Sequence, residues 1–326
     1  MANASKFIDL IGKTPLVDLT SLTRAAQLYA KCEFLNPSFS MKDRIAKYIL
    51  EMAEATNQLK PDDTIVCSSS GNTGCSIAML GAIKGYSVII VVSDKCSMEK
   101  QNHIKSFNAT LIVVDERDYV EYGKKLAQDN DYFDVNQYDN PYNPETYYKT
   151  LGPEIWKETN GKITHFVMTG STFGCISGTA KFLKEKKQAI QVTLADPLYS
   201  NIHSYYYNGY LKNNPQYQPV ATTQSYLIEG AGKQKPTQCL DFSVIDEVLQ
   251  VSDQEAISTC HKLAEKEGLF VGGSSGINVF AATIVANRLK REDVVVTVLA
   301  DNGIKYLSKI YDPRFLTQNK IKTSYV

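Results

Sequence analysis

The chain has 326 residues, of which 43% are hydrophobic and 21% are charged, as is usual for a globular enzyme. Lys and Arg together number 35, as do Asp and Glu, so the formal net charge is zero. A neutral chain lacks the strongly basic surface that binds nucleic acid or acidic membranes, and we expect neither partner. The length suits two lobes or one large α/β domain better than one small core.

The sequence contains no apolar run of the roughly 18 residues that a membrane span needs. Its first residues, MANASKFIDL, show neither the basic nor the apolar region of a signal peptide. The seven cysteines are scattered and form no CxxC motif, which is typical of free thiols in a reducing compartment. The four histidines lack the spacing of metal ligands. These features predict a cytoplasmic protein without a metal site.

Strand-like and helix-like segments alternate through most of the chain. The first expected elements are a strand at 64–70, a helix at 71–86, a strand at 87–93, a helix at 97–109 and a strand at 110–115. Further along we expect one helix at 143–159, a strand at 163–169, a helix at 175–187, a strand at 190–196, a helix at 253–268 and a strand at 294–301. This alternation predicts parallel sheets with helices on both faces. The Tyr-rich segment 199–226 is the exception, expected to be a surface connection with little helix and a candidate lid or interface.

Two Ser- and Gly-rich turns each join an expected strand to an expected helix. They are CSSSGNTGCS at 67–76 and TGSTFGCISG at 169–178. Small residues let backbone N–H groups approach an anion, and a helix N-terminus adds positive potential. Neither turn has the Gly-Lys-Ser/Thr end of a nucleotide-binding P-loop or the GxGxxG of a nicotinamide site. Two such turns indicate two anionic groups, for instance a phosphate and a carboxylate.

The stretch NPSFSMKDR at 36–44 places Lys42 between a Ser-rich turn and the start of an expected helix. Read alone, Lys42 is an ordinary solvated lysine. A lysine amine also forms a Schiff base with an aldehyde, and pyridoxal phosphate carries an aldehyde and a phosphate on one ring. Together with two anion sites, Lys42 is therefore a candidate reactive lysine.

Seven motifs support this interpretation because they occur in the order of one enzyme family. They are IGKTPLV (11–17), AKCEFLNPSFSMKDR (30–44), SSGNTG (69–74), NQYDNPYNPETYYKTLGPEIW (136–156), EGAG (229–232), GGSSG (272–276) and VLADNGIKYL (298–307). On these motifs the chain resembles, nearly end to end, the cysteine synthase and cystathionine β-synthase family of fold-type II pyridoxal-phosphate enzymes. Each motif alone is a weak signal, whereas seven in order are specific.

The resemblance implies an α/β fold of two lobes, each a mostly parallel twisted sheet flanked by helices, with the active site in the cleft between them. It implies a smaller, mobile substrate-loop domain at 34–146 and a larger cofactor-binding domain built from 1–33 and 147–326. It also implies pyridoxal 5′-phosphate as the cofactor, small amino-acid substrates and a homodimer.

Residue by residue, the resemblance assigns Lys42 to the Schiff base and Asn72 to the cofactor's 3′ oxygen. It assigns the substrate carboxylate to Ser69, Ser70, Asn72, Thr73 and Gln137. It assigns the 5′ phosphate to Ser171, Thr172, Gly174 and Cys175. Asn302 corresponds to the family's serine or threonine against the pyridine nitrogen, with Asp301 beside the contact position, and Glu229 is a candidate contact for a second substrate's amine.

The chain departs from the family pattern in the phosphate loop, which is commonly GTGGT and here reads STFGC at 171–175. A thiol is a weaker donor than a hydroxyl, so the backbone N–H groups must carry more of the phosphate contact. This form is closer to the synthases that join O-phosphoserine to glutamate. Ser69 stands where the family usually has threonine, and the neutral Asn302 would not hold the pyridine nitrogen protonated as an aspartate would.

The resemblance implies β-replacement on an O-activated L-serine through an α-aminoacrylate intermediate, with Lys42 removing the α-proton. Cysteine synthase activity, of the O-acetylserine sulfhydrylase type, is the first expectation. Two alternatives are a cystathionine β-synthase-like enzyme and a synthase that joins O-phosphoserine to an amino acid, as in 2,3-diaminopropionate formation. A serine or threonine dehydratase fits less well, because its SxGNHAQG loop differs from SSGNTG.

Overall fold

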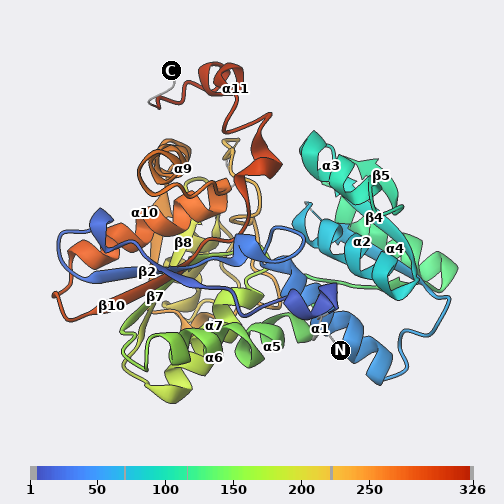
Figure 1. The fold of residues 1–326 in the computed structure, drawn as a ribbon, viewed down its shortest axis with the longest axis horizontal. Helices are drawn as coiled ribbons and strands as arrows, with labels where there is room; N and C mark the ends of the chain where they lie inside the picture. Colours follow the sequence, from blue (N-terminus) through green and yellow to red (C-terminus); the bar gives the residue numbers. More distant parts are fainter. Residues whose placement is uncertain (1–5, 70, 116, 221–222, 324–326) are drawn as a thin grey trace, which may run out of the picture.

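The computed structural model describes residues 6–69, 71–115, 117–220 and 223–323. Its strands form two sheets, and each sheet lies in a lobe of its own (Figure 1). Most neighbouring strands are parallel, and helices flank both sheets. The structure therefore confirms the two-lobed α/β class expected from the sequence. The domain limits at 34–146 stay a prediction, although the whole smaller sheet falls between Thr64 and Asp134.

The larger sheet has six strands in the order β1-β2-β10-β7-β8-β9. They are β1 (Leu16–Asp18), β2 (Gln27–Lys31), β7 (His165–Thr169), β8 (Gln191–Pro197), β9 (Glu247–Val251) and β10 (Val294–Val298). Only β1 runs antiparallel to its neighbour. Within β10, Val294 and Val296 join one buried cluster and Val295 joins another, so both faces of the strand are buried. Two-sided burial explains the continuous apolar run of this strand.

Helices cover the two faces of the larger sheet, with α9 and α10 on one side and α5, α6 and α7 on the other (Figure 1). Their bounds are α5 (Tyr142–Lys149), α6 (Leu151–Glu158), α7 (Gly174–Lys186), α9 (Asp253–Glu267) and α10 (Gly273–Asn287). Shorter elements are α11 (Pro313–Gln318) and the 3₁₀ turns η1 (Phe7–Leu10), η2 (Thr20–Leu22), η3 (Glu33–Leu35), η5 (Phe242–Val244) and η6 (Gly303–Tyr306).

The smaller sheet has four parallel strands in the order β5-β4-β3-β6. They are β3 (Thr64–Ser69), β4 (Ser87–Ser93), β5 (Thr110–Val114) and β6 (Phe133–Asp134). The helices of this part are α1 (Lys42–Ala55), α2 (Asn72–Lys84), α3 (Met98–Lys105) and α4 (Tyr119–Asn130). Val66 and Val91 pack with α4, whereas Ile65 and Ile90 belong to the main core on the other face. The alternation along each strand thus places helices on both faces, as predicted.

The helix expected at 143–159 is instead two helices, α5 and α6, which meet at Thr150. Thr150 has φ −120° and ψ −71°, outside the helical range. Pro153 lies in the first turn of α6 and lacks the N–H that would bond to the carbonyl of Lys149, so one continuous helix is disfavoured. A break at Thr150 places Pro153 in the first turn of a new helix. Backbone N–H groups there have no acceptor within the helix, so the lack of an N–H in proline does not destabilise it.

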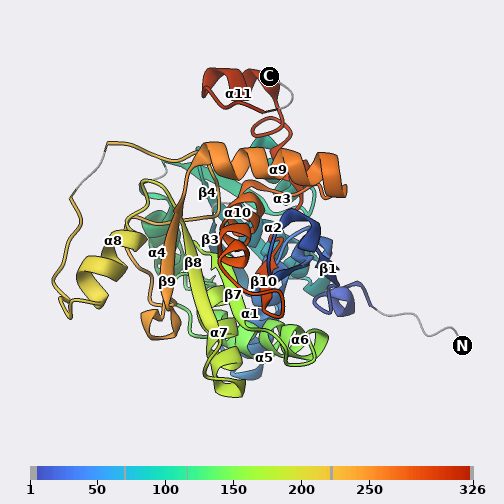
Figure 2. The same cartoon turned by 90° about the vertical axis from the view of Figure 1, so that its left-hand side faces the viewer.

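The Tyr-rich segment 199–226 contains little regular structure, as expected. Its described part includes α8 (Ile202–Ser204) and a π-helical stretch, η4 (Tyr205–Tyr210), which lie toward the outer edge of the larger sheet (Figure 2). The hydroxyl of Tyr206 donates to the carbonyl of Ile245 at 3.0 Å, just before β9. The hydroxyl of Tyr207 accepts from the N–H of Val248 at 3.3 Å. These phenols cover part of an edge strand, which would otherwise present unpaired backbone groups.

A buried ion-pair network fixes α1 against the larger lobe. Arg44 on α1 donates to both carboxylate oxygens of Glu33, at 2.7 and 2.8 Å, and to both oxygens of Glu154, at 2.7 and 2.8 Å. Lys31 pairs with Glu154 at 3.0 Å and with Glu158 at 2.7 Å. Burial alone would raise the pKa of Glu33, but Arg44 holds that pKa below its usual value. The network therefore keeps its charges by pairing them.

Replacing Arg44 with Met should strongly destabilise the fold, because Glu33 is fully buried and would lose its partner. Breaking one side of a buried ion pair costs about 3–5 kcal/mol, and we expect a loss of that size in a urea unfolding experiment. Arg314→Met is the matched control, since Arg314 pairs with Asp312 at the surface and its side chain is 92% exposed. Equal midpoints for the two variants would contradict the assignment.

Candidate active site

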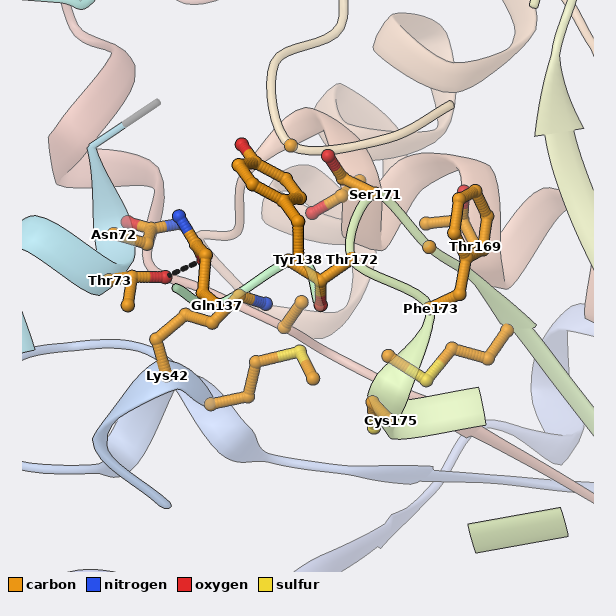
Figure 3. A pocket seen from close by; sticks show the side chains of 16 residues that line it. Lys42, Asn72, Thr73, Gln137, Tyr138, Thr169, Ser171, Thr172, Phe173 and Cys175 are labelled. Atoms are coloured by element: carbon orange, nitrogen blue, oxygen red, sulfur yellow. Dashed lines mark hydrogen bonds between the residues drawn. The ribbon is translucent and has the colours of Figure 1, made fainter. Parts of the chain in front are cut away.

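A cavity lies where strands of both sheets end (Figure 3). Its walls come from the segments that follow β3, β6, β7 and β10 and from the start of α1. The expected site residues that line it are Lys42, Asn72, Thr73, Gln137, Ser171, Thr172 and Cys175. Loops and helix N-termini gather at the carboxyl ends of parallel strands, which is where α/β folds bind ligands. Both predicted anion-binding turns therefore face one cavity.

Lys42 is the first residue of α1, and its side chain extends into the cavity on the same side as Asn72 and Thr73 (Figure 3). Among the described residues, no acceptor or carboxylate is paired with its amine. Burial lowers the pKa of Lys42 from its ordinary value. A lowered pKa increases the share of neutral amine, which is the nucleophilic and basic form. The structure thus presents Lys42 as a reactive amine rather than a solvated charge.

Asp43, the next residue, ties Lys42 to the smaller lobe. Its carboxylate accepts from the N–H of Ser38 at 2.7 Å and from the hydroxyl of Ser76 at 2.6 Å, and the Ser38 hydroxyl also donates to it. Ser76 lies on α2 and its hydroxyl is 3.1 Å from the carbonyl oxygen of Asn72. These contacts fix the start of α1 relative to the start of α2, so Lys42 and Asn72 keep a constant spacing.

The first Ser/Gly turn ends β3 and begins α2. The hydroxyl of Ser69 accepts from the N–H groups of Gly71, at 3.0 Å, and Gly74, at 3.1 Å, so Ser69 shapes the turn. The N–H groups of Asn72 and Thr73 have no acceptor within the described chain. Free N–H groups at a helix N-terminus can bind a carboxylate. Ser70, also predicted here, lies outside the described residues.

The side chains of Thr73 and Gln137 form one unit in the wall of the cavity. Thr73 donates to Gln137 Oε1 at 2.6 Å, and Gln137 Nε2 donates to the carbonyl of Ser68 at 2.6 Å. Both residues are buried, and together they join the segment after β6 to the turn after β3. The structure therefore brings together four of the five residues expected to hold a substrate carboxylate, although Ser69 contacts the turn rather than the cavity.

The second turn, Ser171–Cys175, lies across the cavity from Lys42 (Figure 3). Phe173 has φ +63°, and α7 begins directly after it at Gly174. A Cβ at Gly174 would lie 2.1 Å from the Asn143 amide oxygen, so this close approach requires glycine. The N–H groups of residues 171–176 have no acceptor within the described chain. They form a cradle at a helix N-terminus that fits a phosphate group.

Cys175 forms part of the same cavity wall as a neutral thiol. It is buried, and burial raises the pKa of the thiol above its ordinary value. A neutral thiol is a weak donor, so a phosphate bound here would be held by backbone N–H groups and by the Ser171 and Thr172 hydroxyls. The buried hydroxyl of Thr169, another lining residue, has no partner within the described chain. The wall thus fits the phosphate and polar ring of pyridoxal phosphate, and Lys42 fits its aldehyde.

Asp301, rather than Asn302, contacts a predicted site residue after β10. Asn302 accepts from the N–H of Ile304 at 3.0 Å and caps η6, and it does not line the cavity. Asp301 is fully buried and its Oδ2 accepts from Asn72 Nδ2 at 2.6 Å and from the Tyr306 hydroxyl at 2.5 Å. Successive residues of an extended segment face opposite sides, so a shift of one position decides which residue points inward. The contact of Asn302 with the pyridine nitrogen stays a prediction.

Glu229 lies in an ion-pair cluster and does not line the cavity. Its carboxylate pairs with Lys100 at 2.7 Å and with Lys309 at 2.6 Å. Burial alone would raise the pKa of Glu229, but the two lysines hold that pKa below its usual value. A carboxylate with two cationic partners has little charge left for a substrate amine. The predicted contact of Glu229 with a second substrate therefore finds no support in this arrangement and stays a prediction.

Sequence reasoning missed several lining residues, namely Tyr138, Met168, Thr169, Gly230, Ser274 and Ala300. Gly230 and Ser274 lie within the quoted motifs EGAG and GGSSG, so the motifs gave a signal without a role. Tyr138 directly follows Gln137, and nothing in its local pattern distinguishes it from the many other tyrosines. Lys305, which contacts Asn72 at 2.9 Å, lies within the motif VLADNGIKYL but was also missed, because the motif gives this lysine no role.

The described part of the chain contains no group of three or more His, Cys, Asp or Glu residues that could hold a metal ion. No helix among the described residues is both long and apolar enough to cross a membrane. All seven cysteines are free thiols in the structure.

Comparisons with known proteins agree with this geometry. Residues 8–301 match the family model described as "Pyridoxal-phosphate dependent enzyme". A probable cysteine synthase from Bacillus subtilis (strain 168) is 38% identical over 311 residues, which cover 92% of this chain and 95% of the relative.

Two solved structures have the same fold over nearly their whole length. The crystal structure of O-ureido-L-serine synthase has a TM-score of 0.86 and 29% identity and covers 96% of both chains. The O-acetylserine-dependent cystathionine β-synthase from Helicobacter pylori has a TM-score of 0.85 and 32% identity and covers 96% of this chain and all of that one. The chain therefore belongs to the cysteine synthase and cystathionine β-synthase family of fold-type II enzymes, which depend on pyridoxal phosphate and catalyse β-replacement.

Proposed function

We propose that the protein replaces the β-substituent of an O-activated L-serine, with sulfide as the incoming nucleophile, as a cysteine synthase does. The observation that carries the proposal is the half-buried amine of Lys42, which has no partner within the described chain, in a cavity flanked by the N-termini of α2 and α7. One cradle suits the cofactor phosphate and the other suits the substrate carboxylate. Relatives that carry the name cysteine synthase support this choice of product.

Each wall of the cavity has a distinct task in this proposal. The N–H groups of 171–176 and the hydroxyls of Ser171 and Thr172 hold the phosphate of the cofactor. The start of α2, with Thr73 and Gln137, orients the substrate carboxylate. When bound, pyridoxal phosphate supplies an electron sink that stabilises negative charge at the substrate α-carbon.

Lys42 takes the proton from the substrate α-carbon, because its amine has no other hydrogen-bond partner within the described chain. The β-substituent then leaves with its bonding electrons. No residue has to protonate it, since acetate and phosphate are stable anions. Among the described residues that line the cavity, none is Asp or Glu. A cavity without carboxylates favours the entry of an anionic donor and an anionic nucleophile.

A second candidate function has an amino acid as the nucleophile, and Lys233 favours it. The Lys233 ammonium lies 4.2 Å from the ring centroid of Tyr138, and Tyr138 lines the cavity. The Lys233 backbone is fixed, since its N–H donates to the Ser200 hydroxyl at 3.0 Å and its carbonyl accepts from the N–H of Asn201 at 3.0 Å. Lys233 does not itself line the cavity, but a cation next to a lining residue would attract a carboxylate, which homocysteine, cysteine and glutamate carry and sulfide lacks.

A product screen tests the two candidates together. The enzyme with pyridoxal phosphate is incubated with O-acetylserine or O-phosphoserine and with sulfide, homocysteine, cysteine or glutamate, and products are identified by mass spectrometry. We expect the fastest reaction to yield cysteine from O-acetylserine and sulfide. Cystathionine or another amino-acid adduct as the main product would instead establish the second candidate. Pyruvate as the main product with every nucleophile would contradict both.

Lys42→Ala should abolish the near-visible absorbance of the enzyme-bound cofactor. It should also lower kcat by roughly 10²- to 10⁴-fold, the usual effect of losing a general base. The phosphate cradle is untouched, so the variant should still bind the cofactor in equilibrium dialysis. Lys47→Ala, one turn further along α1 and partly exposed, is the control and should keep both absorbance and activity. An unchanged spectrum in Lys42→Ala would refute the assignment.

Lys233→Met should raise KM for a carboxylate-bearing nucleophile by about tenfold while leaving KM for sulfide unchanged. The estimate follows from the loss of one charge-assisted contact, worth about 1.5 kcal/mol. Steady-state kinetics with homocysteine and with sulfide measure the difference. Lys235→Met removes a nearby exposed charge and serves as the control. Equal effects of Lys233→Met on both nucleophiles would show that Lys233 does not discriminate between them.

A further inference from the structure

The side-chain amide of Asn72 is held at both ends by ionisable groups of the larger lobe. Lys305 Nζ donates to Asn72 Oδ1 at 2.9 Å. At the other end, Asn72 Nδ2 donates to Asp301 Oδ2 at 2.6 Å. The Asp301 carboxylate can only accept, and the Lys305 amine donates, so the two contacts together favour one orientation of the amide. A flipped amide would place its oxygen against Asp301 and its nitrogen against Lys305.

Both partners of Asn72 are themselves buried and fixed. Asp301 is fully buried, Lys305 is 2% exposed, and the Tyr306 hydroxyl donates to Asp301 at 2.5 Å. The carbonyl of Lys305 accepts from the Ser97 hydroxyl at 2.9 Å, which holds η6 against the start of α3. Hydrogen bonds that involve charged groups are stronger when water is excluded. The penalty for flipping the Asn72 amide is correspondingly large.

The fixed orientation leaves one donor available to a ligand. The amide nitrogen of Asn72 carries two hydrogens, and only the one toward Asp301 has an acceptor within the described chain. Asn72 lines the cavity, whereas Asp301 and Lys305 do not. The two charged residues therefore act on the cavity only through Asn72. Burial also lowers the pKa of Lys305, yet the amine can donate to Oδ1 in either protonation state.

We propose that Lys305 and Asp301 are positioning residues that lock the Asn72 amide, so that its remaining N–H donates to the ring oxygen of pyridoxal phosphate. This inference rests on the proposed cofactor contact of Asn72 and adds the reason for its orientation. Without the lock, Asn72 would present its oxygen to the cofactor in part of the molecules. Two oxygens would then face each other without a hydrogen between them.

A double-mutant cycle on cofactor affinity tests the proposal. Apoenzymes of the wild type, Lys305→Met, Asn72→Ala and the double variant are titrated with pyridoxal phosphate, and the absorbance of the bound cofactor is recorded. We expect Lys305→Met to raise the Kd by about tenfold, as loss of an orienting partner does at metal sites. We expect Asn72→Ala to raise it at least as much. In the double variant, loss of Lys305 should add no further effect, because its target is gone.

Two further variants keep the outcome decisive. Ser308→Ala removes a hydroxyl that donates to Glu99 at 2.9 Å, a contact between the segment after η6 and α3, and should leave the Kd unchanged. If Lys305→Met does not fold, Asp301→Asn replaces it, since it removes the charged acceptor that selects the Asn72 nitrogen, weakens the preference for one orientation and should weaken binding in the same non-additive way.

The possible failures differ from one another. Additive effects of Lys305→Met and Asn72→Ala on the Kd would overturn the lock, as would an unchanged Kd in Lys305→Met. An unchanged Kd in Asn72→Ala would overturn the proposed cofactor contact of Asn72 and the lock with it. In each of these cases the product screen would still report the reaction, so failure of the lock is distinguishable from failure of the proposed function.

Discussion

The site depends on one constraint, which is that a lysine amine must extend into a cavity beside two anion cradles without an anion of the protein pairing with it. Lys42 meets this constraint because it opens a helix whose next residue, Asp43, is already engaged by Ser38 and Ser76. Because these hydrogen bonds hold the Asp43 carboxylate, it does not form an ion pair with the Lys42 amine. Burial then lowers the pKa of Lys42 and so increases the share of neutral amine.

Bringing the two cradles together requires the two sheets to end at the same place. One cradle opens α2 after β3 in the smaller sheet, and the other opens α7 after β7 in the larger. Neither sheet alone could hold both the phosphate and the substrate carboxylate. The buried Arg44 and Lys31 network on one side, and the Lys100, Glu229 and Lys309 cluster on the other, join the lobes through paired charges. Pairing is needed because each of these groups would be costly to bury alone.

The sequence predicted the fold class and the two anion-binding turns because buried strands and Ser/Gly turns carry local patterns. Strands such as 87–93 and 110–114 were readable as continuous apolar runs bounded by polar turns. Helix α10 was not predicted, since it is apolar nearly all round and has no alternating polar face to reveal it. The strand β2 was missed as well, because its five residues, QLYAK, mix polar and apolar types within a central position of the sheet.

In the site, too, residues in local sequence motifs could be predicted, whereas residues whose roles depend on tertiary contacts could not. Lys42, Thr73, Gln137 and the Ser171–Cys175 turn were named from sequence motifs and the family resemblance, and in the structure they contribute to the wall of one cavity. The roles of Asp301 and Lys305 could not be found that way, since both depend on where η6 meets α2 in space. The pairing of Glu229 with lysines more than 70 residues away in sequence is likewise a tertiary fact.

The depth of each residue in the cavity explains why reaction type is easier to infer than substrate. In the proposed reaction, the groups that every β-replacement needs are the lysine, the phosphate cradle and the carboxylate cradle, which would surround one cofactor and one donor. Their positions are set by helix starts and strand ends, where α/β folds bind ligands. In this reaction the nucleophile binds last, so it would contact the lining residues that hold neither the cofactor nor the donor. In this chain these residues include Gly230 and Tyr138 with Lys233 beside it, on connections that can vary without disturbing either sheet. The choice of nucleophile is therefore a property of these connections rather than of the fold.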